Sequence, residues 1–361
     1  MLNKHSGIAN PQVPTKYHAA HIGETIGQYT IISKLGWGAS CTAWLAKDVS
    51  RWPWQSTKYV TLKITNLGDE EKKATEEEIA ISRHIAALHS NHEGLPYIRL
   101  VKESFQVEGL LGQHICLVFE PLREPIWLLG KHLRSVGVPP GVLKPFLRII
   151  LQGLDFLHSE CHIIHTDLKA DNFLIGFEDA NVFQRYVRQQ ELDPAPHVFR
   201  NERPVYHSRP DFGSLTKGTG LLRICDFSAA VFGDVATPHN HDIQPLPFCA
   251  PEVLLKAGWT YSADIWNLGT VLWELLGDTT LFGGMEFSRE AHIAQMIRLL
   301  GPPPLEFLKK CDPSIRDGLF SAQGEDKRLF IEFVRKMLRW EPERRLTAKE
   351  LYNDPWLHSK A

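Results

Sequence analysis

The chain has 361 residues, of which 43% are apolar and 23% are charged, and this is an ordinary composition for a globular protein. A formal net charge of −2 gives no overall attraction to nucleic acid or to an anionic membrane surface. No run of about eighteen apolar residues occurs, so no membrane-spanning helix is predicted. The length suffices for one large fold or for two lobes that share a core.

The cysteines and the N-terminus indicate a reducing compartment. Six cysteines, at positions 41, 116, 161, 225, 249 and 311, include no C-x-x-C pair, and most have apolar neighbours. We therefore expect buried, reduced thiols. Residues 1–16 lack an apolar core, so we expect a flexible tail rather than a secretory signal.

The first part of the chain, from residue 28 to residue 122, is predicted to be rich in strands. Alternating segments at 29–36 and 39–49 flank a Gly-rich turn, and further strands are expected at 58–65, 100–109 and 113–120. Residues 69–88 have a helical period, with acidic residues first and apolar residues spaced along one face.

After Pro121 the pattern changes to helices. A long amphipathic helix is expected at 141–160, and further helices are expected at 262–277, 292–301, 328–340 and 347–357. A strand-rich half followed by a helix-rich half predicts an α+β protein with two lobes. Residues 177–220 interrupt this order. They are polar and contain several prolines and glycines, so we expect an irregular inserted loop.

Two motifs in the strand-rich half point to phosphate binding. Gly36 and Gly38 stand between two predicted strands, where glycines allow backbone N–H groups to approach a phosphate closely, although a simple hairpin turn has the same pattern. Lys63 ends an apolar strand, where it needs an anionic partner, and Glu78 follows on the predicted helix. Such a pair can bind the α- and β-phosphates of ATP. The alternative interpretation is that Lys63 and Glu78 are two solvated surface residues.

The strongest motif is the segment IIHTDLKADNFLI at residues 163–175. Its polar residues Asp167, Lys169 and Asn172 stand between apolar flanks. In a phosphoryl-transfer site an aspartate accepts the proton of the attacking hydroxyl, a lysine neutralises the γ-phosphate, and an asparagine ligates magnesium.

With these motifs, residues 17–357 resemble a eukaryotic protein kinase. The segments CAPEVLL, SADIWNLG and WEPERRLTAKELYNDPWL agree with that family, and Arg345 in the last of them should pair with Glu252. The resemblance implies the bilobal protein kinase fold, with a β-rich N-lobe at 17–121 and a helical C-lobe at 122–357 that includes the insert. It also implies the use of ATP and Mg²⁺.

The resemblance further implies an adenine pocket. The adenine should meet the backbone of Glu120 and Leu122, and Phe119 should close the back of the pocket. Thr61 stands where alanine usually lines this pocket. Three apolar side chains should enclose the ring: Leu35, Ala43 and Leu174.

The sequence contains two candidate magnesium-binding motifs, Asp211-Phe212-Gly213 and Asp226-Phe227-Ser228. Asp226 follows an apolar, strand-like segment and lies 24 residues before Ala250, which is a normal activation-segment length by the resemblance. Asp211 follows Pro210 in polar, irregular surroundings. We therefore predict that Asp226 holds magnesium together with Asn172, and that Asp211 lies in a surface turn.

The long insert resembles that of the SR protein kinases, which phosphorylate serines in Arg/Ser-rich segments. The segments KLGWG, HTDLKADN and HIAQMIRLLGPPP agree with that family. The resemblance implies transfer to Ser or Thr of Arg/Ser-rich, splicing-type proteins by a monomer in cytoplasm and nucleus, with no direct binding of nucleic acid or membrane. Thr166 replaces the arginine that usually pairs with an activation-loop phosphate, so we predict activity without that phosphorylation.

Two alternatives remain open. Cys249 replaces an arginine beside the substrate-binding loop, so the target of a Ser/Thr kinase could differ, and Glu286 and Glu290 are candidates for docking basic peptides. The other alternative is a nucleotide-binding pseudokinase scaffold, which would account for small departures from the family pattern at Cys41, Ala43, Thr61 and Ser228.

Overall fold

The computed structural model describes residues 16–200, 203–215, 218–283, 289–301, 303–311, 334–354 and 357. The chain falls into two compact units. The first comprises the residues up to 87, residues 99–125 and residues 174–228, and the second comprises residues 88–98, 126–173 and those from 229 onward. Of the predicted tail, only Lys16 lies within the described residues.

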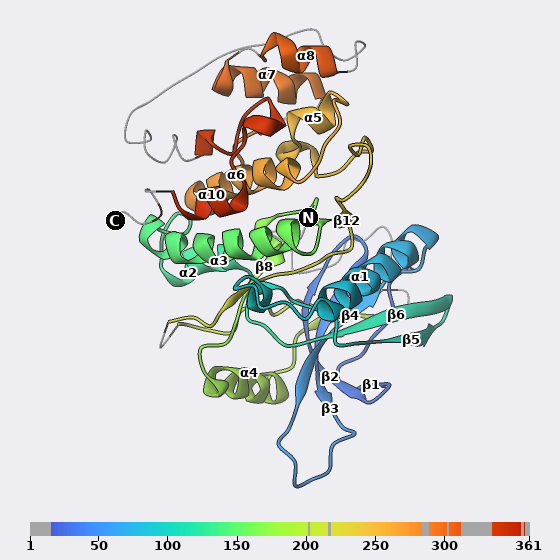
Figure 1. Ribbon diagram of the computed structural model, residues 1–361. Coiled ribbons are helices and arrows are strands. Elements are labelled where there is room, and N and C mark those ends of the chain that lie inside the picture. Colours follow the sequence, from blue (N-terminus) through green and yellow to red (C-terminus); the bar gives the residue numbers. More distant parts are fainter. Residues whose placement is uncertain are drawn as a thin grey trace. The chain divides into compact units, whose positions relative to one another are not determined.

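The first unit is built on a six-stranded antiparallel sheet (Figure 1). In order of pairing, its strands are β1 (Thr25–Ile26), β2 (Tyr29–Trp37), β3 (Cys41–Asp48), β4 (Tyr59–Thr65), β6 (Gly112–Phe119) and β5 (Glu103–Gly109). Branched and aromatic side chains on these strands, such as Ile31, Trp44 and Leu62, are buried in one core. The five longer strands confirm the prediction from alternation.

Helix α1 (Asp69–Ala87) follows β4, as predicted. Its first turn carries Asp69, Glu70 and Glu71, which interact favourably with the positive end of the helix dipole. Glu78 and Ile81 lie on its buried face, so the sequence pattern places a carboxylate inside the unit.

The insert is more regular than predicted. It contains helix α4 (Ala180–Leu192) and a hairpin of β9 (His197–Arg200) and β10 (Arg203–Tyr206). The Asp179 side chain caps α4 by accepting from the N–H of Asn181. The prediction of an irregular loop was wrong because only a narrow apolar stripe of α4 is buried, and the polar residues around it hid the helical period.

The insert packs within the first unit and not within the helical half, where it was predicted. Four of its side chains form a cluster with Leu45 of β3: Val182, Tyr186, Val187 and Phe212. Two glycines bring the ends of the insert together, since the Gly220 N–H donates to the Gly176 carbonyl, and a Cβ on Gly220 would lie 2.5 Å from the Phe177 oxygen. Beside them, β8 (Phe173–Ile175) pairs with β11 (Leu222–Ile224).

The second unit is mostly helical. Its described helices are α2 (Leu129–His132), α3 (Pro140–Ser159), α5 (Pro251–Leu254), α6 (Ser262–Gly277), α7 (Arg289–Leu300), α8 (Leu305–Lys310) and α10 (Ala348–Tyr352). Short 3₁₀ turns lie at Leu95–Tyr97, Ile126–Leu128, Ala170–Asn172, Leu246–Phe248 and Pro342–Arg344. Strand β7 (Ile163–Ile164) pairs with β12 (Val231–Phe232).

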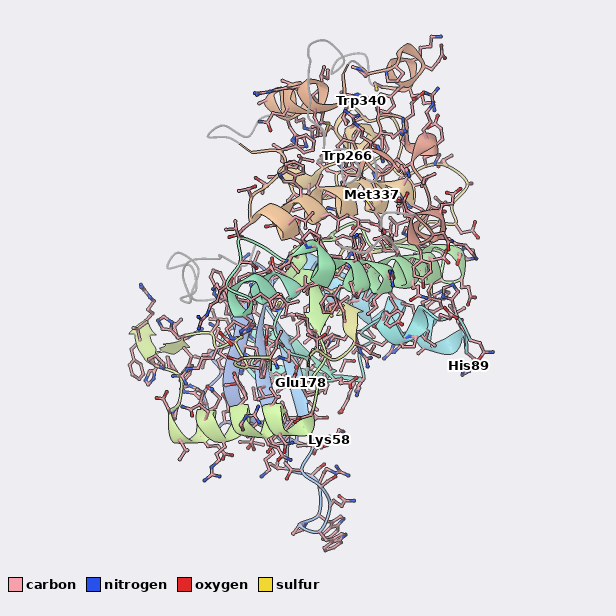
Figure 2. The ribbon with its side chains drawn as sticks, turned by 90° about the vertical axis from the view of Figure 1, so that its left-hand side faces the viewer. Lys58, His89, Glu178, Trp266, Met337 and Trp340 are labelled. Atoms are coloured by element: carbon pink, nitrogen blue, oxygen red, sulfur yellow. The ribbon has the colours of Figure 1, made fainter. Side chains whose placement is uncertain are left out.

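Helix α6 forms the centre of this unit and has the bounds predicted from the sequence. Trp266 of α6 is fully buried, and Met337 and Trp340, which Figure 2 also labels, are buried in the same unit. Of the helix predicted at 328–340, residues 328–333 lie outside the described residues, residues 334–335 are helical, and residues 336–340 are turn and irregular structure rather than helix.

Two general expectations can be compared with the structure. None of the six cysteines forms a disulfide, and five of them are buried, as predicted. Within the described part of the chain, no helix combines the length and the apolar character that crossing a membrane requires.

Candidate active site

Lys63 is the centre of the candidate site in the first unit. Its Nζ atom donates to Oε2 of Glu78 on α1 at 2.7 Å and to Oδ1 of Asp226 at 2.7 Å. The predicted pairing of Lys63 with Glu78 is confirmed. Burial opposes the charge on Lys63, but the carboxylates of Asp226 and Glu78 outweigh it and raise its pKa well above the ordinary value, so this lysine is a cation at neutral pH.

Asp226 has the geometry of a residue that ends a strand. It follows β11, and its φ of +68° is in the left-handed region, which aspartate tolerates better than most residues. The Ser228 hydroxyl donates to Oδ1 of Asp226 at 2.9 Å, and Phe227 between them is buried. The non-glycine residue at 228 therefore holds the carboxylate that also meets Lys63.

Asp211, the other candidate, lies in an exposed turn of the insert. Its carboxylate accepts the N–H of Gly213 at 2.8 Å, and Gly213 has a φ of +85°. Phe212 is buried against α4. This agrees with the predicted surface turn, and the carboxylate that joins Lys63 is that of Asp226.

The Gly-rich turn joins β2 to β3. The Gly38 N–H donates to the Cys41 carbonyl at 2.9 Å, and Gly36 pairs with Ala43 beside a register shift in β2. A Cβ added at Gly38 would meet nothing within 4 Å. The backbone at Gly38 therefore has the open space that a phosphate needs for the predicted close approach.

The segment after β6 contains the predicted adenine-binding backbone. The Glu120 carbonyl accepts from Nη2 of Arg99 at 2.6 Å, and a carbonyl oxygen has a second lone pair for another donor. Leu122 is buried, and the bridge between Pro125 and Leu174 places β8 against this segment. Arg99 was not predicted from the sequence, and its guanidinium also lies 4.7 Å from the centre of the Phe119 ring.

Thr61 provides a test of whether a nucleotide fits here. It lies on β4 two residues before Lys63 and pairs with Phe119, and its side chain is buried. Its hydroxyl has no hydrogen-bond partner among the described residues, and an unpartnered buried hydroxyl is costly. An adenine at the position implied by the family resemblance would bring polar atoms to this hydroxyl, so the site fits a polar base.

In the second unit, the three polar residues of the strongest sequence motif lie in one loop between β7 and β8. The Lys169 ammonium contacts Oδ2 of Asp167, and Nδ2 of Asn172 donates to the Asp167 carbonyl at 2.9 Å. The three residues predicted from the strongest motif are therefore neighbours. Because the amide nitrogen of Asn172 is in use, its oxygen is the atom suited to a metal ion.

Asp264 of α6 supports this loop from inside the second unit. Its carboxylate accepts the N–H groups of His165 and Thr166 at 2.8 Å each, and Nε2 of His158 lies 2.9 Å away. A carboxylate at zero exposure needs several donors. In the sequence Asp264 is the acidic residue of the SADIWNLG segment, and an acidic residue inside a largely apolar helix is a signal of a buried supporting role.

Hydrogen bonds, a ring contact and ion pairs hold the segment from 229 to 252. The Thr166 hydroxyl donates to the Ala229 carbonyl at 2.7 Å. His239 and Trp259 exchange backbone hydrogen bonds and stack at 4.6 Å. The Asp242 carboxylate contacts both Lys256 and Arg289.

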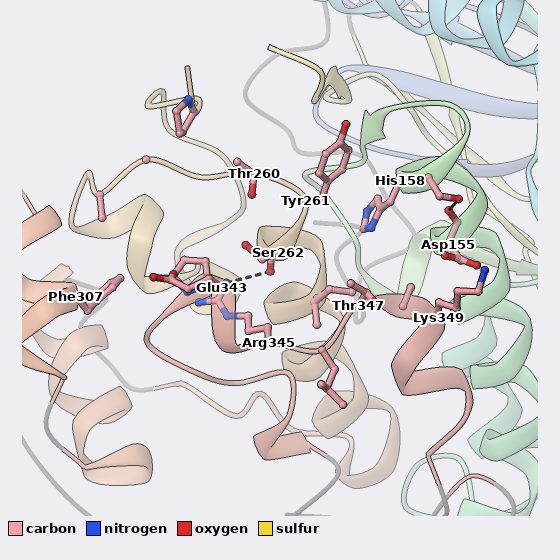
Figure 3. Close-up of a pocket in the computed structure, with 18 of the residues that line it drawn as sticks. Asp155, His158, Thr260, Tyr261, Ser262, Phe307, Glu343, Arg345, Thr347 and Lys349 are labelled. Atoms are coloured by element: carbon pink, nitrogen blue, oxygen red, sulfur yellow. Dashed lines mark hydrogen bonds between the residues drawn. The ribbon is translucent and has the colours of Figure 1, made fainter. Parts of the chain in front are cut away.

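The predicted pair of Arg345 and Glu252 is confirmed. Both side chains have zero exposure, and the guanidinium meets both carboxylate oxygens. Nη1 of Arg345 also donates to the Ser262 carbonyl at 3.0 Å (Figure 3). A cavity of about 920 Å³ opens beside this pair, and none of the residues predicted for catalysis or nucleotide binding lines it.

The comparisons with known proteins agree with this geometry. Residues 29–357 match the protein kinase domain family, and the chain belongs to that family. A serine/threonine protein kinase of Aspergillus fumigatus is 34% identical over 94% of this chain and 87% of its own length. The serine/threonine-protein kinase SRPK of Physarum polycephalum is 29% identical over 94% of this chain and 88% of its own length.

A structural comparison gives the same fold. The crystal structure of a kinase domain aligns with a TM-score of 0.69 and 22% identity over 94% of this chain and 98% of that one. The protein is therefore an SRPK-like serine/threonine protein kinase with the α+β kinase fold. Kinases of this family generally use ATP and Mg²⁺.

The donor chemistry of the chain fits magnesium. Mg²⁺ prefers oxygen ligands and is usually held by one or two protein groups together with phosphates. The carboxylate of Asp226 and the side-chain amide of Asn172 each offer an oxygen of this kind. In the described part of the chain, no group of three His, Cys, Asp or Glu side chains could hold a metal without phosphates.

Proposed function

We propose that the protein transfers the γ-phosphate of ATP to serine or threonine in Arg/Ser-rich, splicing-type proteins. Asp167 accepts the proton of the substrate hydroxyl, and Lys169 neutralises the transferred phosphate. Asp226 and Asn172 hold Mg²⁺, which when bound offsets the charge that develops on the phosphates. The observation that carries this proposal is the single ammonium of Lys63 between Glu78 and Asp226.

The remaining residues of the proposed site bind ATP. Lys63, which Glu78 orients, contacts the α- and β-phosphates beneath the Gly-rich turn at Gly36 and Gly38. The backbone of Glu120 and that of Leu122 meet the adenine. The side chains that enclose the ring are Leu35, Ala43 and Leu174.

The substrate class is supported by relatives and by the insert. A relative that covers 94% of this chain is named SRPK, and human SRSF protein kinase 3 is 31% identical over 46% of this chain. The two acidic residues suggested for docking basic peptides add nothing to this support, because Glu286 and the side chain of Glu290 lie outside the described residues.

We further propose that activity does not require phosphorylation of the activation segment. Thr166 cannot pair with a phosphate as an arginine does, and its hydroxyl already bonds Ala229. Asp242 supplies a fixed negative charge to Lys256 and Arg289, which is the kind of contact that a phosphate would otherwise make.

By the same family resemblance, we propose that the enzyme acts as a monomer in the cytoplasm and nucleus. Its proposed partners are protein substrates rather than nucleic acid or membranes. Fractionation of cells with the tagged full chain tests the location, and light scattering of the purified protein tests the oligomeric state.

The substrate proposal is tested with two peptides, one of Arg/Ser repeats and one with lysine in place of each arginine. We expect faster transfer from Mg-ATP to the arginine peptide, and the same rate after phosphatase treatment of the enzyme. Equal rates on both peptides would contradict the substrate class. Loss of activity after phosphatase treatment would contradict the proposed independence of phosphorylation.

A further inference from the structure

One stretch of the insert contacts two segments that border the proposed adenine pocket. Residues 206–213 lie between β2, just before the Gly-rich turn, and Arg123, just after Leu122. All of these residues belong to the first compact unit. We refer to residues 206–213 as the bracing segment.

At one end, the bracing segment bonds to β2. The pairing of β1 with β2 covers only Tyr29 and Thr30 of β2. Further along the strand, the Arg209 N–H donates to the Lys34 carbonyl at 2.8 Å, and Nζ of Lys34 donates to the Tyr206 carbonyl at 3.3 Å. The backbone that leads into the Gly-rich turn is therefore held by the insert.

In the middle, the segment packs through an aromatic cluster. The Phe212 ring lies 4.1 Å from Tyr186 and 5.0 Å from Phe177. The Tyr186 hydroxyl donates to the Arg209 carbonyl at 2.7 Å. Leu35, which we propose encloses the adenine, packs against the same cluster.

At the other end, the segment bonds to a buried guanidinium. Nη2 of Arg123 donates to the Gly213 carbonyl at 2.5 Å, and Nη1 donates to both oxygens of Glu178 at 2.8 and 2.7 Å. Arg123 is only 2% exposed and also contacts Glu124. Glu178, which Figure 2 labels, stands just before Asp179, the cap of α4, so Arg123 joins the start and the end of the insert.

We propose that the bracing segment positions the two borders of the ATP site, with Arg123 and Phe212 as its positioning residues. Through the aromatic cluster that contains Phe212 it fixes Leu35, and through Arg123 it fixes the backbone next to Leu122. This inference rests on the proposed function, because it assumes that ATP binds between these borders. The first Asp-Phe-Gly motif thereby gains a role in shaping the pocket rather than in holding metal.

The bracing segment belongs to the same unit as the proposed adenine pocket, whereas Asp167 and Lys169 belong to the other unit, so its loss should weaken ATP binding more than chemistry. The test uses Arg123→Lys, which keeps the buried charge, and Phe212→Leu, which keeps an apolar side chain. Matched controls in the same insert are Arg188→Lys and Phe199→Leu, whose side chains are exposed. Calorimetry measures the Kd for ATP, and steady-state assays measure both KM values and kcat.

We expect both variants to raise the Kd and the KM for ATP by about tenfold, since each loses strong contacts that order the site. The peptide KM and the kcat at saturating ATP should stay within about twofold, as should all constants of the controls. A merely structural role would lower the Tm and leave the Kd for ATP unchanged, and that result would overturn the inference alone. Failure of the wild type to bind ATP would instead overturn the proposed function on which it rests.

Discussion

The Nζ atom of Lys63 lies 2.7 Å from Oδ1 of Asp226 and 2.7 Å from Oε2 of Glu78, so one ammonium joins a strand, a helix and the segment after β11. The exposure of its side chain is 13%. Two carboxylates around one cation leave a net negative charge, which suits a site that receives a divalent metal with its phosphates.

We expect Lys63→Met to lower kcat/KM by at least about a hundredfold, because the phosphates lose a fixed cation and two carboxylates are left facing each other. The phosphorylation rate of a peptide substrate measures this effect. Lys73→Met on the exposed face of α1 is the matched control and should keep full activity. A Lys63→Met enzyme with wild-type kinetics would contradict the assignment.

Ser228 takes the place of the usual glycine and donates to Asp226 at 2.9 Å. We expect Ser228→Ala to lower kcat by about three- to tenfold, through loss of one hydrogen bond to a charged group. Ser228→Gly should lower kcat somewhat further, because glycine also frees the backbone. Stopped-flow or steady-state assays distinguish these modest losses from a collapse of activity, which would mean that Ser228 takes part in the chemistry itself.

Arg345 and Glu252 form an ion pair with no solvent exposure. Removing one partner leaves an uncompensated buried charge, so we expect Arg345→Met to lower the free energy of unfolding by about 3–5 kcal/mol. The adjacent Arg344, which is 64% exposed, offers the control Arg344→Met, with an expected change below about 1 kcal/mol. Urea unfolding measures both, and equal midpoints for the two variants would be inconsistent with this account.

The burial of Lys34 should make the free energy of unfolding depend on pH. It is 3% exposed, and burial lowers its pKa from 10.5 to about 8. Between these values the unfolded chain binds more protons at Lys34 than the folded chain does, so the contribution of this group to stability rises with pH across that window. Below it, the folded state bears the full cost of a buried charge.

We therefore expect Lys34→Met to be more stable than the wild type near pH 7, and the difference to shrink as the pH rises from about 8 to about 10. Comparing the two proteins removes the titration of groups that they share. Urea unfolding at several pH values gives the difference directly. A difference that stays constant with pH would show that Lys34 keeps an ordinary pKa in the folded protein.

The elements that could be predicted from the sequence are those specified by patterns of neighbouring residues. The largely apolar run of α6, which is buried continuously from Ala263 to Leu272, and the alternation of the sheet strands specify those elements locally. The pairs of Lys63 with Glu78 and of Arg345 with Glu252 follow from charged residues in apolar settings, which need partners.

The insert could not be predicted in the same way. Helix α4 buries only a narrow stripe, and Arg123 stands in a polar stretch that looks exposed in the sequence. Its partners Glu178 and Gly213 follow Arg123 in the chain by 55 and 90 residues. Whether they meet Arg123 therefore depends on where the whole insert packs. The orphaned hydroxyl of Thr61 likewise becomes apparent only when its surroundings are known.

The central claim is that Asp226, and not Asp211, serves the transfer of phosphate. The most direct measurement is phosphorylation of an Arg/Ser-repeat peptide from Mg-ATP by the wild type, by Asp226→Asn and by Asp211→Asn. We predict that Asp226→Asn loses at least about 99% of the rate, because the metal and Lys63 lose a charged partner, while Asp211→Asn stays within about twofold. Full activity in Asp226→Asn, or loss of activity only in Asp211→Asn, would contradict the account.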